Sequence, residues 1–182
     1  IMVTYPPDSR FSYSGAGFLV LQHLIEKRSG VKYSKHLGGM LASIGAKAAS
    51  FDLYPPPHQL LALGHDQRGR ALKGGHELVP WAAAGGLFTS ATSMAEVLVT
   101  LLRGGDDVVD ADLVTQMISD GLGVFFRPGA SGSFVHGGDN GGFRASITGL
   151  PESMNGAVVL TNGRSSQGVT LRRNLASLVL DP

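Results

Sequence analysis

The chain has 182 residues, 43% of them hydrophobic, and a formal net charge of +1 from 15 basic and 14 acidic residues. This length and hydrophobic content suit one globular domain or a large part of one, and they exclude a disordered chain. The charges form no like-charged run, so nucleic acid is excluded as an electrostatic partner, and no apolar stretch approaches the ~18 residues of a membrane span.

The sequence contains no cysteine. This excludes a disulfide framework and thiolate catalysis but barely constrains the compartment, so localisation stays open between a periplasmic or secreted protein and a cytoplasmic one. The chain opens Ile1-Met2, without an initiator methionine, and residues 5–8 read like a loop inside a longer protein. We therefore expect a cut or truncated N-terminus.

Apolar residues at helical spacing predict a first helix over residues 16–28, which ends before Gly30. A second helix is predicted over 33–48, although each of its glycines weakens it by roughly 1 kcal/mol relative to alanine. Residues 50–81 are punctuated by glycine and proline, and they predict loops with one short hairpin.

Apolar residues at helical spacing from Met94 to Leu102 predict a third helix that ends at Gly104-Gly105. Its start offers two alternatives: Ser90 as N-cap, or Ser93 with Glu96 as a capping box. A shorter helix is predicted over 111–118. Four short segments rich in Val, Ile and Phe then predict an antiparallel meander: residues 122–126, 133–136, 145–150 and 157–161.

Apolar residues between Val169 and Val179 predict a C-terminal helix that covers one face of this sheet. The order of the elements predicts an α+β fold, with an antiparallel sheet, a C-terminal helix packed on it, and a helical and loop region. Neither an internal repeat nor a linker divides the chain.

Two short motifs attract attention: Tyr13-Ser14-Gly15 at the head of the first helix, and His136-Gly137-Gly138 on a strand about 120 residues later. The sequence around the two motifs resembles the serine hydrolases built like class C β-lactamases, DD-peptidases and related esterases. The segments that carry the resemblance are Arg10-Phe11-Ser12-Tyr13-Ser14-Gly15-Ala16-Gly17-Phe18 and Phe134-Val135-His136-Gly137-Gly138-Asp139-Asn140-Gly141-Gly142-Phe143. The resemblance implies a β-lactamase/transpeptidase-like fold. It also implies that residues 1–182 form the C-terminal part of a single β-lactamase-like domain.

In this family a Ser-x-x-Lys helix start supplies nucleophile and base, and a tyrosine motif supplies a second proton-handling group. The resemblance assigns catalytic roles to Tyr13 and to His136, whose imidazole orients or shares a proton with the tyrosine. Gly15 stands where the family usually has Asn, so an amide contact to substrate is weakened.

The resemblance also implies substrate-binding positions on the late strand. Gly137 and Gly138 leave room for substrate to lie against the strand backbone, and the N–H of Asp139 is one candidate oxyanion donor. The second donor would be the N–H of the missing serine.

One literal Ser-x-x-Lys is present, Ser29 to Lys32, but it ends a helix, whereas a nucleophile belongs at a helix N-terminus. Ser43 and Lys47 are one residue too far apart. Without the resemblance, Tyr13 reads as a packing residue at a helix entry. His136 alone likewise reads as an ordinary strand residue.

No metal or cofactor is predicted. The other histidines, His23, His36, His58, His65 and His76, show no metal-ligand spacing. The paired glycines near residue 140 lack the Lys-Ser or Lys-Thr of a phosphate cradle.

Two functions are therefore in view. The first is the C-terminal half of a serine hydrolase that acts by acyl transfer on an ester, amide or β-lactam carbonyl of a small-molecule or peptide substrate. It would be inactive alone and would need an N-terminal segment of the same enzyme, separate or cleaved, to supply Ser-x-x-Lys. The alternative is a non-catalytic β-lactamase-like module that binds a cell-wall peptide or a protein partner.

Overall fold

The computed structural model describes residues 2–54, 61–126 and 132–165, together with four single positions beyond residue 165. Within these ranges it contains α-helices, a sheet and one 3₁₀ turn, which confirms the predicted α+β class. The elements are α1 (Gly15–Ser29), α2 (Tyr33–Ser43), α3 (Ala82–Gly85), α4 (Ala91–Leu102), α5 (Ala111–Ser119), β1 (Phe125–Phe126), β2 (Phe134–Asn140), β3 (Phe143–Leu150), η1 (Pro151–Ser153) and β4 (Asn155–Thr161). The helix predicted between Val169 and Val179 lies largely outside the described residues.

The sheet is an antiparallel meander in the order β1-β2-β3-β4, as the sequence predicts. Only two residues join β2 to β3, and Gly142 adopts a φ of 85° in this turn, where a side chain would be strained. β2 continues to Asn140, four residues beyond the predicted end, because its polar and glycine-rich second half carries no apolar alternation to reveal a strand.

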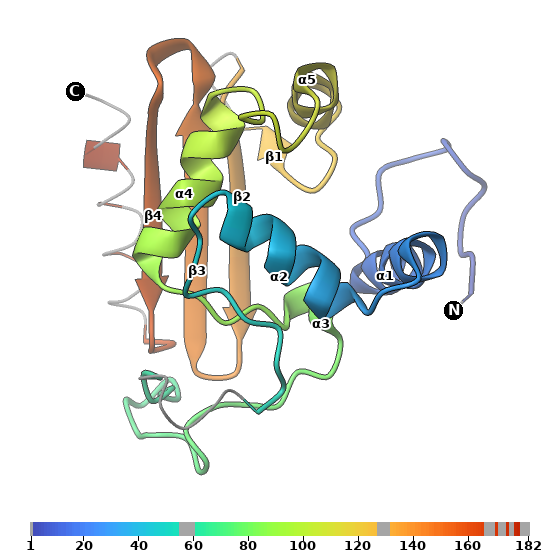
Figure 1. Cartoon of the computed structure of the whole chain (residues 1–182). Coiled ribbons are helices and arrows are strands. Elements are labelled where there is room, and N and C mark those ends of the chain that lie inside the picture. Colours follow the sequence, from blue (N-terminus) through green and yellow to red (C-terminus); the bar gives the residue numbers. More distant parts are fainter. Residues whose placement is uncertain are drawn as a thin grey trace.

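α4 lies across β3 and β4 and supplies the helical side of the core (Figure 1). Leu98 of α4 meets Phe134 and Ile147, both buried, in one apolar cluster. Two paired glycines, Gly149 and Gly156, make this contact possible. A Cβ on Gly156 would lie 2.6 Å from Cδ2 of Leu98, so the helix approaches the sheet backbone directly.

The helix caps follow simple local chemistry. Ser14 caps α1, because its Oγ accepts a hydrogen bond from the N–H of Gly17 at 3.0 Å, and Gly30 ends the helix in the left-handed conformation. For α4 the structure selects Ser90, whose Oγ accepts from the N–H of Ser93 at 3.1 Å. The hydroxyl of Ser93 instead accepts from the N–H of Ala48 at 3.0 Å.

α2 is shorter than predicted. It ends at Ser43 because Gly45 takes a φ of 86°, which breaks the helical backbone five residues before the expected end near residue 48. The described residues of the following segment, 50–54 and 61–81, are loop-rich, as expected, and within them His65 forms a short antiparallel bridge with Ala71. None of the helices in the described part of the chain is long and apolar enough to cross a membrane.

Candidate active site

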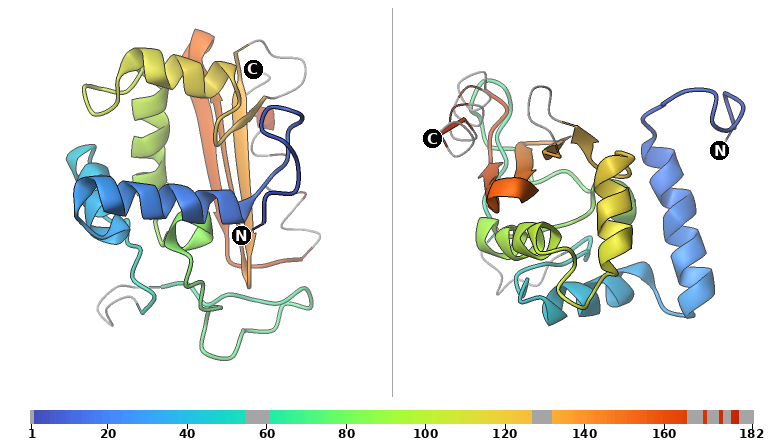
Figure 2. Two further views of the ribbon diagram at one scale, coloured as in Figure 1. Left: turned by 90° about the vertical axis from the view of Figure 1, so that its right-hand side faces the viewer. Right: turned by 90° about the horizontal axis from the view of Figure 1, so that it is seen from above.

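A cavity of about 380 Å³ opens where the N-terminal end of α1 meets β2 and the residues before β1. Figure 2 shows this end of α1 beside the sheet, with the helix running away from it toward α2. Tyr13 and His136, more than 120 residues apart in the chain, both line the cavity. The remaining lining residues are Phe11, Ser12, Ser14, Gly17, Phe18, Leu21, Gly121, Gly123, Val124 and Phe125.

Phe125 contacts both of these side chains. Its ring stacks on Tyr13 with centroids 6.0 Å apart and an interplanar angle of 29°. It also stacks on His136 at 5.6 Å and 30°. Tyr13 is 63% exposed, so its hydroxyl is accessible, while the face of its ring is fixed by the phenylalanine.

His136 is oriented by a hydrogen bond to the main chain. Its Nδ1 lies 2.7 Å from the carbonyl oxygen of Gly123. A carbonyl only accepts, so Nδ1 carries the proton. In the neutral ring Nε2 is then the unprotonated nitrogen, able to accept a hydrogen bond from a hydroxyl in the cavity.

Among the described residues, no strand pairs with the outer side of β2 past His136, and this part of the strand is called the open edge of β2. β1 pairs only with Phe134 and Val135, so it does not reach further along the strand. Asn140 and Phe143 close the turn as a hydrogen-bonded pair. In an antiparallel ladder hydrogen-bonded and non-hydrogen-bonded pairs alternate along the strand, so the N–H groups of Gly137 and Asp139 point away from β3. An extended substrate could pair with these two residues.

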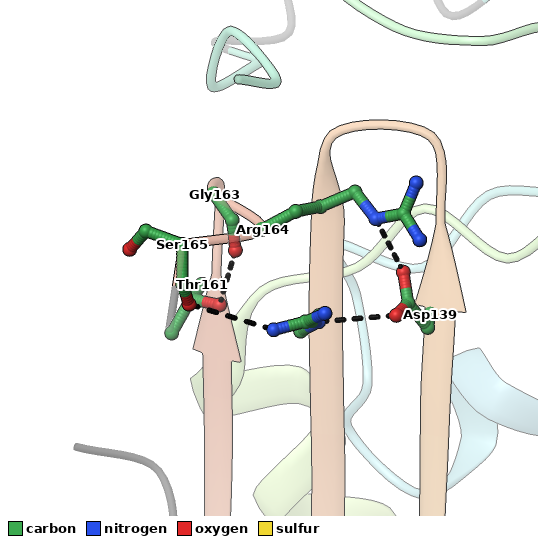
Figure 3. A network of polar contacts seen from close by, with 6 residues as sticks. Asp139, Thr161, Gly163, Arg164 and Ser165 are labelled. Atoms are coloured by element: carbon green, nitrogen blue, oxygen red, sulfur yellow. Dashed lines mark hydrogen bonds and ion pairs between the residues drawn. The ribbon is translucent and has the colours of Figure 1, made fainter. Parts of the chain in front are cut away.

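The side chain of Asp139 lies on the opposite face of the sheet from His136, because the two residues are three apart on one strand. It accepts a hydrogen bond from Nε of Arg144 at 3.1 Å and forms an ion pair with Nε of Arg164 at 2.9 Å (Figure 3). A second nitrogen of Arg144 reaches the carbonyl oxygen of Ser165 at 3.5 Å. The contacts join β2, β3 and the segment after β4.

The structure thus brings two of the six sequence-predicted site residues, Tyr13 and His136, into one cavity. The other four do not line it. Gly15 packs instead toward α3, where a Cβ would lie 3.7 Å from that of Ala84. Gly137, Gly138 and Asp139 lie farther along β2, and their roles, like those of the two rings, stay predictions.

Sequence reasoning missed Phe125 and the carbonyl of Gly123. Phe125 falls inside a predicted strand, but nothing in its neighbourhood distinguishes it from Phe126 beside it. Ser29 is correctly set aside, since it is the last residue of α1 and lies roughly 21 Å along the helix from Gly15. Within the described ranges no group of three His, Asp or Glu side chains is placed to hold a metal ion.

The chain is similar to a protein family and to several solved structures. The family model described as Beta-lactamase matches residues 3–180. No curated protein matches the chain. Among solved structures, the chain is similar to the octameric penicillin-binding protein homologue from Pyrococcus abyssi, with 23% identity, a TM-score of 0.74, and coverage of 88% of this chain and 40% of that one.

Two further structures share the fold. The beta-lactamase/D-alanine carboxypeptidase from Pseudomonas syringae is 13% identical with a TM-score of 0.76, and the match covers 99% of this chain and 62% of that one. The D-amino acid amidase from Ochrobactrum anthropi, complexed with D-phenylalanine, is 19% identical with a TM-score of 0.65, covering 95% and 63%. The chain therefore spans 40 to 63% of the length of these three structures. With a family model that matches nearly its whole length, the chain belongs to the Beta-lactamase family of serine hydrolases.

Proposed function

We propose that this chain is the C-terminal half of a serine hydrolase that acts by acyl transfer on an ester, amide or β-lactam carbonyl. The nucleophile would come from an N-terminal segment that carries Ser-x-x-Lys. The observation that carries the proposal is the convergence of Tyr13 and His136 on one cavity beside the open edge of β2.

In the proposed reaction the serine hydroxyl attacks the carbonyl carbon as the motif lysine takes its proton. The oxyanion would accept hydrogen bonds from the N–H of Asp139 and from that of the serine. Collapse of this intermediate breaks the bond to the leaving group, which receives a proton from Tyr13 and leaves an acyl-enzyme. In deacylation the Tyr13 phenolate takes a proton from the attacking water, and the lysine returns its proton to the serine oxygen as the acyl group leaves. His136 holds the phenol in place throughout.

The proposed N-terminal segment has a surface to cover. No residue of α1 is buried, and four of its large apolar side chains are 36 to 55% exposed: Phe18, Val20, Leu21 and Leu24. A helix that carries this much apolar surface normally packs against further elements of its domain. In the described residues, moreover, the outer edge of β4 pairs with no other strand, and open edges favour strand addition.

The test is covalent labelling of the complete protein, meaning this chain together with the upstream Ser-x-x-Lys segment. A fluorophosphonate or fluorescent penicillin probe should label a serine upstream of this chain, and nitrocefin or p-nitrophenyl acetate should be turned over. Replacing that serine by alanine is the control, and it should abolish both signals. A folded complete protein without labelling would contradict the proposal.

The same experiment addresses the alternative, a non-catalytic module that binds a cell-wall peptide or a protein partner. Gly15 favours it, because it replaces the Asn usual in the tyrosine motif. The module would show peptide binding without covalent labelling.

A further inference from the structure

A second cavity, of about 630 Å³, lies at the end of the sheet where β2 turns into β3. Its walls come from the loop 66–77, from the turn residues Gly141 and Gly142, and from Arg164 after β4. Figure 1 places this loop beyond the end of the sheet at which β2 and β3 are joined. We propose that this basic cleft, defined by Arg68, Arg70, Lys73, His76 and Arg164, binds a small oxyanion, a phosphate or a carboxylate.

Charge is the first argument. The walls carry four cationic side chains against two carboxylates, those of Asp66 and Glu77. Asp66 and Arg70 neutralise each other: Oδ2 of Asp66 accepts from Nε of Arg70 at 2.8 Å, and its Oδ1 accepts from the N–H of Arg68 at 2.8 Å. Arg164 is paired with Asp139 at 2.9 Å. No ion pair within the described residues engages Arg68 or Lys73. Guanidinium and ammonium groups gathered in one concave site match a carboxylate or phosphate.

The cleft also contains a buried ring nitrogen without a partner among the described residues. Nε2 of His76 is buried and has no hydrogen-bond partner within the described part of the chain. The ring packs edge-on against Phe88 with centroids 5.3 Å apart, which holds it in place. Buried polar atoms without partners are rare and call for a ligand or solvent group. In the tautomer that carries the ring proton on Nε2, an oxyanion in the cleft would accept the hydrogen bond that this nitrogen lacks.

The third argument is that the backbone around the cleft is already ordered. The N–H of His65 donates to the carbonyl oxygens of Gly142 at 3.2 Å and Asn162 at 2.9 Å, which ties the loop to the turn and to the end of β4. The N–H of Gly64 also donates to the carbonyl oxygen of Gly75 at 2.6 Å and closes the loop on itself. Binding would therefore require little ordering of the chain, a condition that favours affinity.

The cleft is separate from the candidate active site. The two cavities share no lining residue. Gly141, in the turn after β2, lies five positions beyond His136, or roughly 17 Å of extended chain. The inference thus goes beyond the proposed acyl transfer, and either one can fail without the other.

The experiment is calorimetric titration of the complete protein with inorganic phosphate, and in a second arm with succinate, in chloride buffer at constant ionic strength. We expect saturable binding of one of the two anions, and the anion that binds more tightly shows whether the ligand is a phosphate or a carboxylate. In the double variant Arg68→Gln/Lys73→Gln the dissociation constant should rise at least 10-fold. The matched control, Lys27→Gln/Arg28→Gln on α1, removes the same charge far from the cleft and should change it less than twofold.

His76→Phe gives a second readout that does not depend on surface charge. Phenylalanine keeps the aromatic contact with Phe88 and removes the buried nitrogen, so the variant should fold with unchanged or higher thermal stability. The rise in melting temperature that the preferred anion produces in the native protein should be lost. Unsaturable binding of both anions, or equal weakening in the α1 control, would overturn the proposal.

Discussion

His136 and Phe125 stack at the mouth of the candidate active site, with ring centroids 5.6 Å apart. Because the ring of Phe125 also stacks on Tyr13, one phenylalanine fixes the positions of two residues that come from opposite ends of the chain. β1, which carries it, is only two residues long and pairs with β2 at Phe134 and Val135. This short pairing therefore sets the geometry of the cavity.

Phe125→Ala should lower kcat/KM of the complete enzyme roughly 10-fold, because both rings lose the surface that aligns them. Phe126→Ala is the matched control, since Phe126 neighbours it on β1 and does not line the cavity. Both positions are more than a third exposed, so we expect both variants to unfold at urea concentrations close to the native protein. Equal kcat/KM values for the two variants would show that Phe125 does not position Tyr13 and His136.

Tyr13→Phe should lower kcat on the order of 100-fold or more, because it deletes the proposed proton donor and keeps the stacked ring. Tyr54→Phe removes a hydroxyl from a residue that is 71% exposed, and it should leave turnover unchanged. Steady-state kinetics with an amide or alkyl ester substrate, whose leaving group must be protonated, provides the measurement. A Tyr13→Phe enzyme with native kcat would show that the phenol takes no part in proton transfer.

Gly149→Ala should destabilise the fold by about 1 to 3 kcal/mol, the usual penalty for overpacking a core. A Cβ there would lie 2.6 Å from Cε1 of Phe134 and 3.1 Å from Cδ1 of Leu98. Gly38→Ala serves as control. Gly38 lies within α2 with open space around it, so alanine should stabilise by up to about 1 kcal/mol. Urea unfolding of both variants measures the difference, and equal shifts would contradict this account of the core.

Asp66 should contribute to the pH dependence of stability. Hydrogen bonds from Arg70 lower the pKa of its carboxyl from 3.8 to about 2. Since the folded-state pKa is the depressed one, the contribution is fully present above about pH 4 and is lost as the pH falls toward 2.

Asp66→Asn removes this dependence. The melting temperatures of the native protein and the variant should differ most above pH 4 and converge near pH 2. The Asp66 side chain is 28% exposed at the molecular surface, where solvent screens the interaction, so we expect the difference to be small. A difference in melting temperature between the two proteins that stays constant down to pH 2 would rule out this role for Asp66.

Much of the architecture is legible in the order of residues. The α1 and α4 helices, Ser90 as one of the two candidate caps of α4, and the meander follow from periodicity and capping chemistry, which act over a few residues. The Tyr13 and His136 motifs are recognisable in the same way. Sequence patterns gave wrong boundaries at two elements. Gly45 adopts the left-handed conformation and ends α2 before its predicted end, and the polar second half of β2 shows no apolar alternation that would predict a strand.

The convergence of the site lies beyond local patterns. Phe125 meets Tyr13 because β1 pairs with β2 in one particular register, and a shift by one residue would turn that ring to the other face of the sheet. The contacts of Asp139 with Arg144 and Arg164 and the basic cleft likewise join segments far apart in the chain. Such contacts depend on how sheet and loops pack, so amino-acid order specified the chemical groups, whereas packing brought them within reach of one another.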